Sequence, residues 1–399
     1  MTLTKFKSIF NKISILASLL VLTGTIVLLW RSFSASGYGT YSGQIAFYLL
    51  TFPLALFILG VAAFIIFLLL IWKKSALFLK IIWAVVCISF LGIALLSGLQ
   101  NQHYAGRIDT ETAFMDNYTF NFSGTDTHSD LEEDVVYKTS EDENLLLDVW
   151  DTKVNNKQRP VIVNIHGGGW SGGDKSEVSS WSKWFNSKGY VVFNIEYSQN
   201  GPGMWQTQIS DTHAALDWIV EHADEYQLDV DRINLIGSSA GGHLALLTGY
   251  TELKGNSLIP RETDSDSTVE INSIINLYGP SDLLRLYDEN SSKEFVHPLL
   301  EQLLDEPPKT EEIKQRYQQM SPVQYVNETS APTISFVGQK DKVVPEEQIE
   351  ILHEKLDENK VDNQAYYFPF SDHSYDTNWK GIATQATKQK IEEFLNKYN

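Results

Sequence analysis

The stretch that most limits how this chain can fold is the five-residue run GSSAG at 237–241, which has the pattern G-x-S-x-G. It directly follows the apolar run Ile233–Ile236 and precedes a helix-like stretch, Gly242–Tyr250. In a strand, tight turn and helix of this kind, the central serine takes a strained backbone conformation, and glycine on each side avoids a clash. Ser239 would then present its hydroxyl at the carboxyl end of a sheet, whereas Ser238 would point elsewhere. The pattern alone also fits an ordinary loop at the start of a helix.

A second glycine-rich motif, HGGGW at 166–170, follows the apolar run Val161–Ile165. Its three successive glycines, Gly167, Gly168 and Gly169, let backbone N–H groups approach a substrate oxygen closely, as an oxyanion hole requires. A glycine loop can also cradle a phosphate. The chain has no G-K-[ST] motif, so nucleotide binding of the P-loop kind is not indicated.

The two motifs, HGGGW and GSSAGG, each follow a strand and occur in this order. Together they resemble the esterase and lipase branch of the alpha/beta-hydrolase superfamily. The resemblance implies an α/β fold with a mostly parallel, twisted sheet and helices on both faces. It also implies that Ser239 is the nucleophile, and that backbone N–H groups of Gly167–Gly169 and Ala240 form the oxyanion hole. His166 would brace the glycine loop by hydrogen bonding.

The general base is sought among the histidines, because a serine hydroxyl needs a partner that takes its proton. In alpha/beta-hydrolases the chain order is Ser, then the acid, then His. Four histidines follow Ser239, namely His243, His297, His353 and His373. The first lies on the helix that leaves the G-x-S-x-G turn, the second in a long insertion and the third within a helix. His373 lies in a loop after the last predicted strand, so we predict that it is the base.

The acid that orients this base has two main candidates. Asp341 lies in G-x-x-D-x-x-V-P at 338–345, a pattern that resembles the acid loop of the family. Asp282 follows the preceding predicted strand and is the rival, although it also suits a loop or a helix cap. Asp372 is too close in sequence to His373 to orient it. The resemblance favours Asp341.

The first 100 residues contain no Asp or Glu and include three long apolar stretches, at about 13–30, 45–71 and 81–99. Each is close to the roughly 20 residues that cross a bilayer. Trp30 and Trp72 lie at the expected interfaces. We therefore predict a membrane domain at 1–100 with three transmembrane helices. A cleaved signal peptide is disfavoured, because the first apolar core is too long.

Basic residues flank these stretches unevenly. The loop between the first and second stretches has only Arg31, whereas the N-terminus and the loop between the second and third stretches carry three lysines each: Lys5, Lys7, Lys12, Lys73, Lys74 and Lys80. The positive-inside rule places these lysines in the cytoplasm. We therefore expect a multi-pass protein of the cell membrane, with residues 101–399 outside the cytoplasm and the N-terminal spans in contact with the lipid bilayer.

Charge separates the two parts of the chain. The whole chain carries −19, so the seven positive charges of residues 1–100 leave −26 on residues 101–399. Nucleic-acid binding is not expected, because phosphate contacts need patches of Lys and Arg. The single cysteine, Cys87, lies in the third apolar stretch. No His, Asp or Cys cluster has the spacing of metal ligands, so we predict neither a metal nor another cofactor.

Beyond the membrane domain, residues 101–130 are polar and predict a juxtamembrane linker, and residues 131–399 have about the size of one α/β domain. An antiparallel pair at 135–137 and 145–150 precedes six further predicted strands at 161–165, 190–195, 233–236, 271–277, 333–337 and 365–368. Helical stretches between strands predict a mostly parallel, covered sheet. The insertion at 281–325 is either a lid over the site or a set of packing helices.

The sequence thus predicts a membrane-anchored serine hydrolase that cleaves carboxylic esters, as a carboxylesterase or deacylase, with Ser239, His373 and Asp341 as its triad. Its substrate would be a small-molecule or polysaccharide-linked ester. A serine peptidase or amidase with the same triad is the alternative. A non-catalytic, membrane-anchored binding module is a third possibility.

Overall fold

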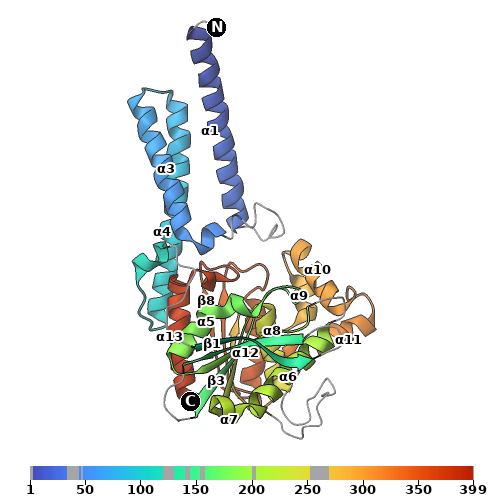
Figure 1. Ribbon diagram of the computed structural model, residues 1–399. Coiled ribbons are helices and arrows are strands. Elements are labelled where there is room, and N and C mark those ends of the chain that lie inside the picture. Colours follow the sequence, from blue (N-terminus) through green and yellow to red (C-terminus); the bar gives the residue numbers. More distant parts are fainter. Residues whose placement is uncertain are drawn as a thin grey trace.

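The computed structural model describes residues 3–33, 45, 48–119, 130–139, 144–152, 158–199, 204–251 and 269–398. Three long helices, α1 (Leu3–Phe33), α3 (Pro53–Trp72) and α4 (Leu77–Arg107), form a helical stalk that projects from an α/β domain (Figure 1). The stalk and the domain meet where the end of α4 lies beside α13 (Ile382–Tyr398).

The α/β domain contains an eight-stranded sheet of order β1-β2-β4-β3-β5-β6-β7-β8. β1 pairs with β2 and β2 with β4 in the antiparallel sense, and all other neighbours are parallel. This confirms the predicted mostly parallel sheet with an antiparallel pair at its start. The strands are β1 (Asp130–Thr139), β2 (Asn144–Asp151), β3 (Arg159–Ile165), β4 (Val191–Ile195), β5 (Leu228–Ser238), β6 (Ile271–Leu277), β7 (Thr333–Gly338) and β8 (Asn363–Phe368).

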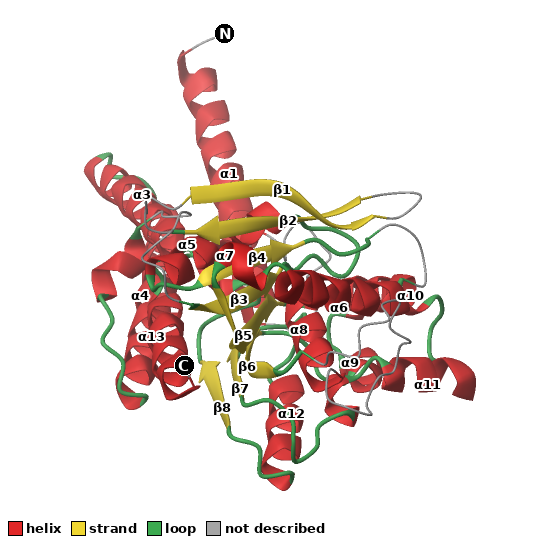
Figure 2. Ribbon diagram, turned by 60° about the horizontal axis from the view of Figure 1, so that its bottom comes forward, coloured by secondary structure: helices red, strands yellow, loops and turns green. Residues whose placement is uncertain are grey.

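Helices cover both faces of the sheet. Neighbouring residues of a strand point to opposite faces, and in these strands the residues on either face are apolar and need a covering layer. Val161, Val163 and Ile165 of β3 belong to one buried cluster, whereas Ile162 belongs to the other. The first cluster includes residues of α6 (Trp205–Glu221) and α8 (Ala240–Thr251), and the second includes residues of α5 (Ser179–Ser187) and α13 (Figure 2). The short α7 (Ala223–Tyr226) precedes β5, and α12 (Glu347–Glu358) lies between β7 and β8.

The insertion at 281–325 folds into three helices, α9 (Leu283–Glu289), α10 (Lys293–Leu304) and α11 (Glu311–Gln319). Leu283, Leu300 and Tyr317 are fully buried. Leu283 and Leu300 belong to the same cluster as the sheet residues. These helices therefore pack on the core of the α/β domain.

Two stalk helices, α3 and α4, are long and apolar enough to cross a membrane by length and composition, within the described part of the chain. In α1, a helix of 31 residues, the stretch Lys12–Val27 is apolar among the side chains that the structure describes. The described residues thus contain two helices of spanning length and composition where the sequence predicts three spans, and the bounds of these helices differ from the predicted ones. The second apolar helix begins at Pro53 rather than near residue 45, and the third extends from Leu77 to Arg107.

The expected linker at 101–130 differs most from the structure. Residues 101–107 are the last turns of α4, and Phe114–Tyr118 form a short 3-10 helix, η1, while residues 120–129 lie outside the described residues. At 31 residues, α4 is about 46 Å long, more than the ~30 Å of a hydrocarbon core. Its polar end forms contacts with the α/β domain, and this explains why a polar segment is helical rather than a loose linker.

Candidate active site

Ser239 lies between β5 and α8, and its φ of +54° is in the left-handed region that side chains rarely adopt. A Cβ at Gly237 would collide with the carbonyl oxygen of Gly241, and a Cβ at Gly241 would collide with that of Ile165. Both flanking glycines are therefore sterically required. The Ser239 N–H donates to the Leu277 carbonyl of β6 at 2.9 Å, which anchors the strained turn to the sheet.

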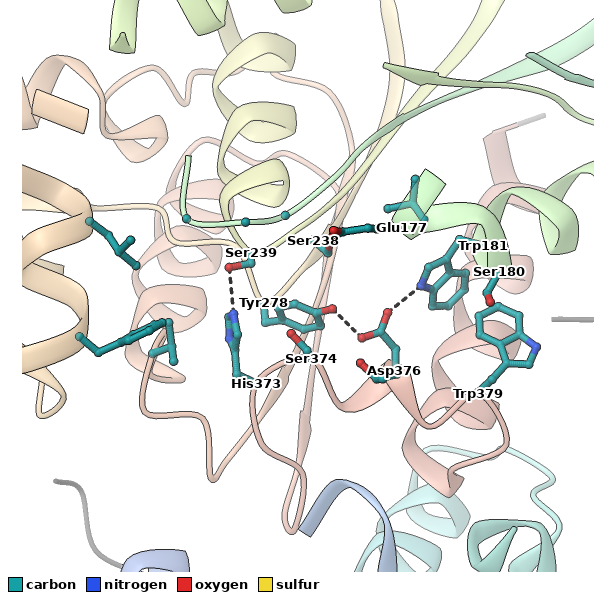
Figure 3. A pocket seen from close by; sticks show the side chains of 18 residues that line it. Glu177, Ser180, Trp181, Ser238, Ser239, Tyr278, His373, Ser374, Asp376 and Trp379 are labelled. Atoms are coloured by element: carbon teal, nitrogen blue, oxygen red, sulfur yellow. Dashed lines mark hydrogen bonds between the residues drawn. The ribbon is translucent and has the colours of Figure 1, made fainter. Parts of the chain in front are cut away.

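The three side chains predicted as a triad meet at the carboxyl ends of β5, β7 and β8. His373 Nε2 lies 2.8 Å from Ser239 Oγ (Figure 3). On the other side of the ring, His373 Nδ1 lies 2.6 Å from Asp341 Oδ2. These distances are within hydrogen-bonding range. With Nδ1 donating to Asp341, Nε2 is free to accept the serine proton.

Asp341 is held independently of the histidine. Its Oδ1 accepts the backbone N–H groups of Val343 at 2.9 Å and Val344 at 2.8 Å, and its side chain is fully buried. The G-x-x-D-x-x-V-P turn thus orients the carboxylate by its own backbone. The other carboxylate oxygen is directed to the imidazole.

The charged groups around His373 favour its protonated form more than water does. Burial lowers the pKa of His373, but the Asp341 carboxylate, through its charge and its hydrogen bond, outweighs burial and the net pKa is raised. Asp372 and Asp376 contribute in the same direction. Burial, followed by the nearby charge of Asp341, raises the pKa of Asp372 to about 7. Asp372 accepts the backbone N–H of His373 at 2.8 Å, so it holds the loop rather than the ring.

The other candidates are engaged elsewhere. His243 accepts from Trp170 Nε1 at 3.2 Å and contacts the Met320 carbonyl at 2.6 Å, and burial lowers its pKa to about 4. His297 lies 2.8 Å from the Tyr287 carbonyl, and His353 lies 2.6 Å from Asn363 Oδ1. Asp282 caps α9, because its Oδ1 accepts the Arg285 N–H at 3.0 Å.

The glycine loop lies against the serine turn. Gly168 and Gly169 have φ values of +122° and +60°, and a Cβ at Gly168 would collide with the Gly172 carbonyl. A Cβ at Gly167 would come within 3.0 Å of the Ser238 carbonyl oxygen. His166 Nδ1 lies 2.7 Å from the Gly167 carbonyl, and its ring stacks on Tyr197, a residue that sequence reasoning missed.

Ser238 lies beside the neighbouring glycine loop, and its Oγ would be 3.4 Å from a Cβ at Gly167. Ser238 lines the same pocket as Ser239, because the last residue of β5 lies directly beneath the glycine loop (Figure 3). Among the described residues, however, His373 Nε2 makes its serine hydrogen bond with Ser239. The distinction between the two serines therefore rests on contact with the histidine.

The triad serine and histidine open into a pocket of about 430 Å³. Phe295 and Leu299 of α10, with Val343, give it an apolar wall, whereas Glu177 and Asp376 line it with carboxyl groups.

Sequence reasoning also missed a polar cluster in this pocket. Asp376 accepts from the Tyr278 hydroxyl at 2.5 Å and from Trp181 Nε1 at 2.7 Å (Figure 3). These residues come from three distant segments. The only local signal for the cluster was the position of Asp376 three residues after His373.

Known proteins match both the sequence and the fold. The family described as BD-FAE matches residues 147–356, which include Ser239 and Asp341 but not His373. The chain is 29% identical over 240 residues to the probable carboxylic ester hydrolase LipM of Mycobacterium tuberculosis, covering 59% of this chain and 54% of LipM. It is 27% identical over 262 residues to the esterase LipC of the same organism, covering 63% of this chain and 62% of LipC. The chain thus spans less than two thirds of the length of these relatives.

Among solved structures, the chain resembles the thermophilic esterase Est2 of Thermogutta terrifontis with propionate bound. The TM-score is 0.55 at 24% identity, and the match covers 67% of this chain and 94% of that one. This likeness shows the alpha/beta-hydrolase fold. The residues that the family model matches, 147–356, lie in the α/β domain.

Proposed function

The chain belongs to the BD-FAE family, and from this premise we propose that it is a serine hydrolase that cleaves carboxylic esters through an acyl-enzyme. The hydrogen-bonded series Ser239–His373–Asp341 beside the glycine loop carries the proposal. The esterases LipM and LipC among the relatives support it.

The geometry allows both halves of acyl transfer. His373 Nε2 accepts the Ser239 proton as Oγ attacks the ester carbonyl, while Asp341 holds Nδ1–H and stabilises the imidazolium. Backbone N–H groups of Gly167–Gly169 and Ala240 are the proposed donors to the oxyanion, and Ala240 begins α8, whose N-terminal dipole favours negative charge. The imidazolium then protonates the leaving alcohol. Water, deprotonated by His373, cleaves the acyl-enzyme and releases the acid.

The pocket walls suggest how an ester would be held. Phe295 and Leu299 provide apolar surface for the acyl group, and the hydroxyl and carboxyl groups of Ser238 and Asp376 can accept hydrogen bonds from a polyhydroxylated alcohol. We therefore propose a small-molecule or polysaccharide-linked ester of a short acyl group as the substrate.

A panel of substrates tests this proposal. We expect the purified full-length protein to hydrolyse p-nitrophenyl esters of short acids and to cleave aminoacyl anilides far less efficiently, because an activated ester has a much better leaving group than an amide and the wall formed by Phe295 and Leu299 suits a short acyl group. The measurement is the ratio of kcat/KM for the two classes. Cleavage of anilides with comparable efficiency would indicate a peptidase or amidase. Neither turnover nor fluorophosphonate labelling would indicate a non-catalytic binding module.

We further propose that α1, α3 and α4 all cross the cell membrane and that the α/β domain lies outside the cytoplasm. The length and apolar surface of α3 and α4 support this, since large apolar side chains such as Ile65 and Ile88 are exposed along them. The uneven distribution of lysines supports the orientation.

Cysteine labelling tests the orientation. In a Cys87→Ser background, Glu311→Cys is expected to react with a membrane-impermeant maleimide in intact cells, because Glu311 lies on an exposed surface of the α/β domain. Lys74→Cys, in the loop between α3 and α4, should react only after lysis. The reverse pattern would place the α/β domain in the cytoplasm.

A further inference from the structure

The loop that carries His373 is in direct contact with the stalk. Asn101, near the end of α4, is buried beneath this loop, and its side chain contacts two successive residues. Asn101 Oδ1 accepts the Phe370 N–H at 3.1 Å, and Asn101 Nδ2 donates to Ser371 Oγ at 3.3 Å. One side chain of the stalk therefore holds the chain two residues before the histidine.

The other side of the loop is held in the same way. Asn378 Nδ2 donates to the Thr51 carbonyl, just before α3, at 3.0 Å. Asn117 Oδ1, in η1, accepts the Ile382 N–H at 3.2 Å. His373 thus lies between two attachments of its loop. One is to α4, and the other is to the residues just before α3 and in η1. In Figure 1 this contact lies where the base of the stalk meets the α/β domain.

A small cavity of about 20 Å³ lies between these contacts, lined by residues of both the stalk and the loop. Three buried polar atoms at its wall have no hydrogen-bond partner among the residues that the structure describes: Thr51 Oγ1, Asn117 Nδ2 and Asn378 Oδ1. Burial without a hydrogen bond is unfavourable for each of these groups. One water molecule needs about this volume and two to four polar partners, and here it finds a hydroxyl, a donor and an acceptor.

We propose that Asn101 is a positioning residue for catalysis and that, together with one water bound by Thr51, Asn117 and Asn378, it holds the His373 loop in its productive place. The inference rests on the proposed esterase function. Both hydrogen bonds of the imidazole depend on where this loop lies. The stalk then supports the catalytic geometry in addition to any role as an anchor.

Asn101→Ala in the full-length protein tests the proposal. We expect kcat for a p-nitrophenyl ester to fall about 10- to 100-fold, as small misplacements of catalytic groups do, with KM little changed. The pH profile should also change. Neutral His373 is the active form, so kcat/KM falls as pH falls through its pKa. A looser contact with Asp341 lowers that raised pKa, and the acid limb should move to lower pH.

Other groups near the imidazole also influence the pKa of His373. Asp372 and Asp376 lie on the same loop and move with it, and the ring of Tyr278 packs against the imidazole at 4.8 Å. Lys342 lies near Asp372 and lowers its pKa. Asp341 is the charged partner that is fixed on another element, so it dominates the expected shift.

Gln389→Ala is the matched control. Gln389 of α13 accepts the Glu111 N–H at 2.9 Å, in the same interface between stalk and domain but away from the loop. This variant should keep the wild-type kcat and acid limb. Thermal unfolding of both variants checks that they are folded. If Asn101→Ala does not fold, Asn378→Ala removes the attachment on the other side of His373 and should give the same two changes.

The outcomes separate this inference from the function on which it rests. An active wild type, with kcat and acid limb unchanged in the folded Asn101→Ala or Asn378→Ala variant, would overturn the positioning role alone. A wild type without ester turnover would overturn the proposed function and this inference with it. A crystal structure should show one water within hydrogen-bonding distance of Asn117 Nδ2 and Asn378 Oδ1. An empty cavity would contradict the proposed role of the water.

Discussion

Ser239→Ala is expected to abolish fluorophosphonate labelling and to remove essentially all ester turnover. The nucleophilic oxygen is lost, because Ser239 Oγ is the oxygen that lies 2.8 Å from His373 Nε2. Among the described residues, the neighbouring Ser238 makes no hydrogen bond with His373 that could activate it. The free energy of unfolding should change little, because the hydroxyl faces a pocket and alanine tolerates the same turn only slightly less well. Active-site labelling and turnover, measured beside a thermal unfolding curve, check both parts.

Ser238→Ala is the matched control, and it is informative because Ser238 lines the same pocket. Labelling should persist, since the His373–Ser239 hydrogen bond does not involve this side chain. A loss of stability of up to about 1 kcal/mol is expected if its hydroxyl is hydrogen-bonded. Labelling that survives in Ser239→Ala and disappears in Ser238→Ala would show that the wrong serine was assigned.

Asp341→Asn is expected to lower kcat by about 10⁴ while the fold is retained. The amide oxygen can still accept the N–H groups of Val343 and Val344, so the turn should persist. Its NH₂ group would face His373 Nδ1 and favour the tautomer in which Nε2 is protonated. That tautomer cannot take the Ser239 proton. Steady-state kinetics beside a circular dichroism spectrum separate loss of turnover from loss of fold.

The corresponding change at the rival acid should have little effect on turnover. Asp282 caps α9 through the Arg285 N–H, and asparagine caps helices about as well as aspartate does. Asp282→Asn should therefore retain nearly wild-type kcat and stability. A large loss of kcat in Asp282→Asn with none in Asp341→Asn would move the acid to the end of β6.

Much of this architecture could be predicted from local patterns. Short apolar runs bounded by glycine and polar residues identified the strands, because a strand buried on both faces must be apolar throughout. The G-x-S-x-G turn and the HGGGW loop were recognisable because their backbone conformations exclude side chains at certain positions, as the collisions at Gly237 and Gly168 illustrate. His373 and Asp341 were predicted from chain order and family resemblance, and the structure brings both within hydrogen-bonding distance of one another.

The remaining features depend on contacts between distant segments, which leave no local pattern. Asp376, Tyr278 and Trp181 form one polar cluster only because the loops after β6 and β8 and the start of α5 converge on the pocket. Ser238 faces that pocket because β5 ends beneath the glycine loop.

The sequence by itself determined the elements, the order of the motifs and the apolar stalk, because each of these follows from the periodicity and steric demands of neighbouring residues. The conformation of residues 101–107, in contrast, depends on tertiary contacts alone. Their polar composition predicted a linker, but the buried hydrogen bonds of Asn101 with Phe370 and Ser371, and of Tyr104 with Tyr367, continue the helix onto the catalytic domain. A buried polar side chain must find partners, and those partners lie about 270 residues away in the chain, beyond the range of any local pattern.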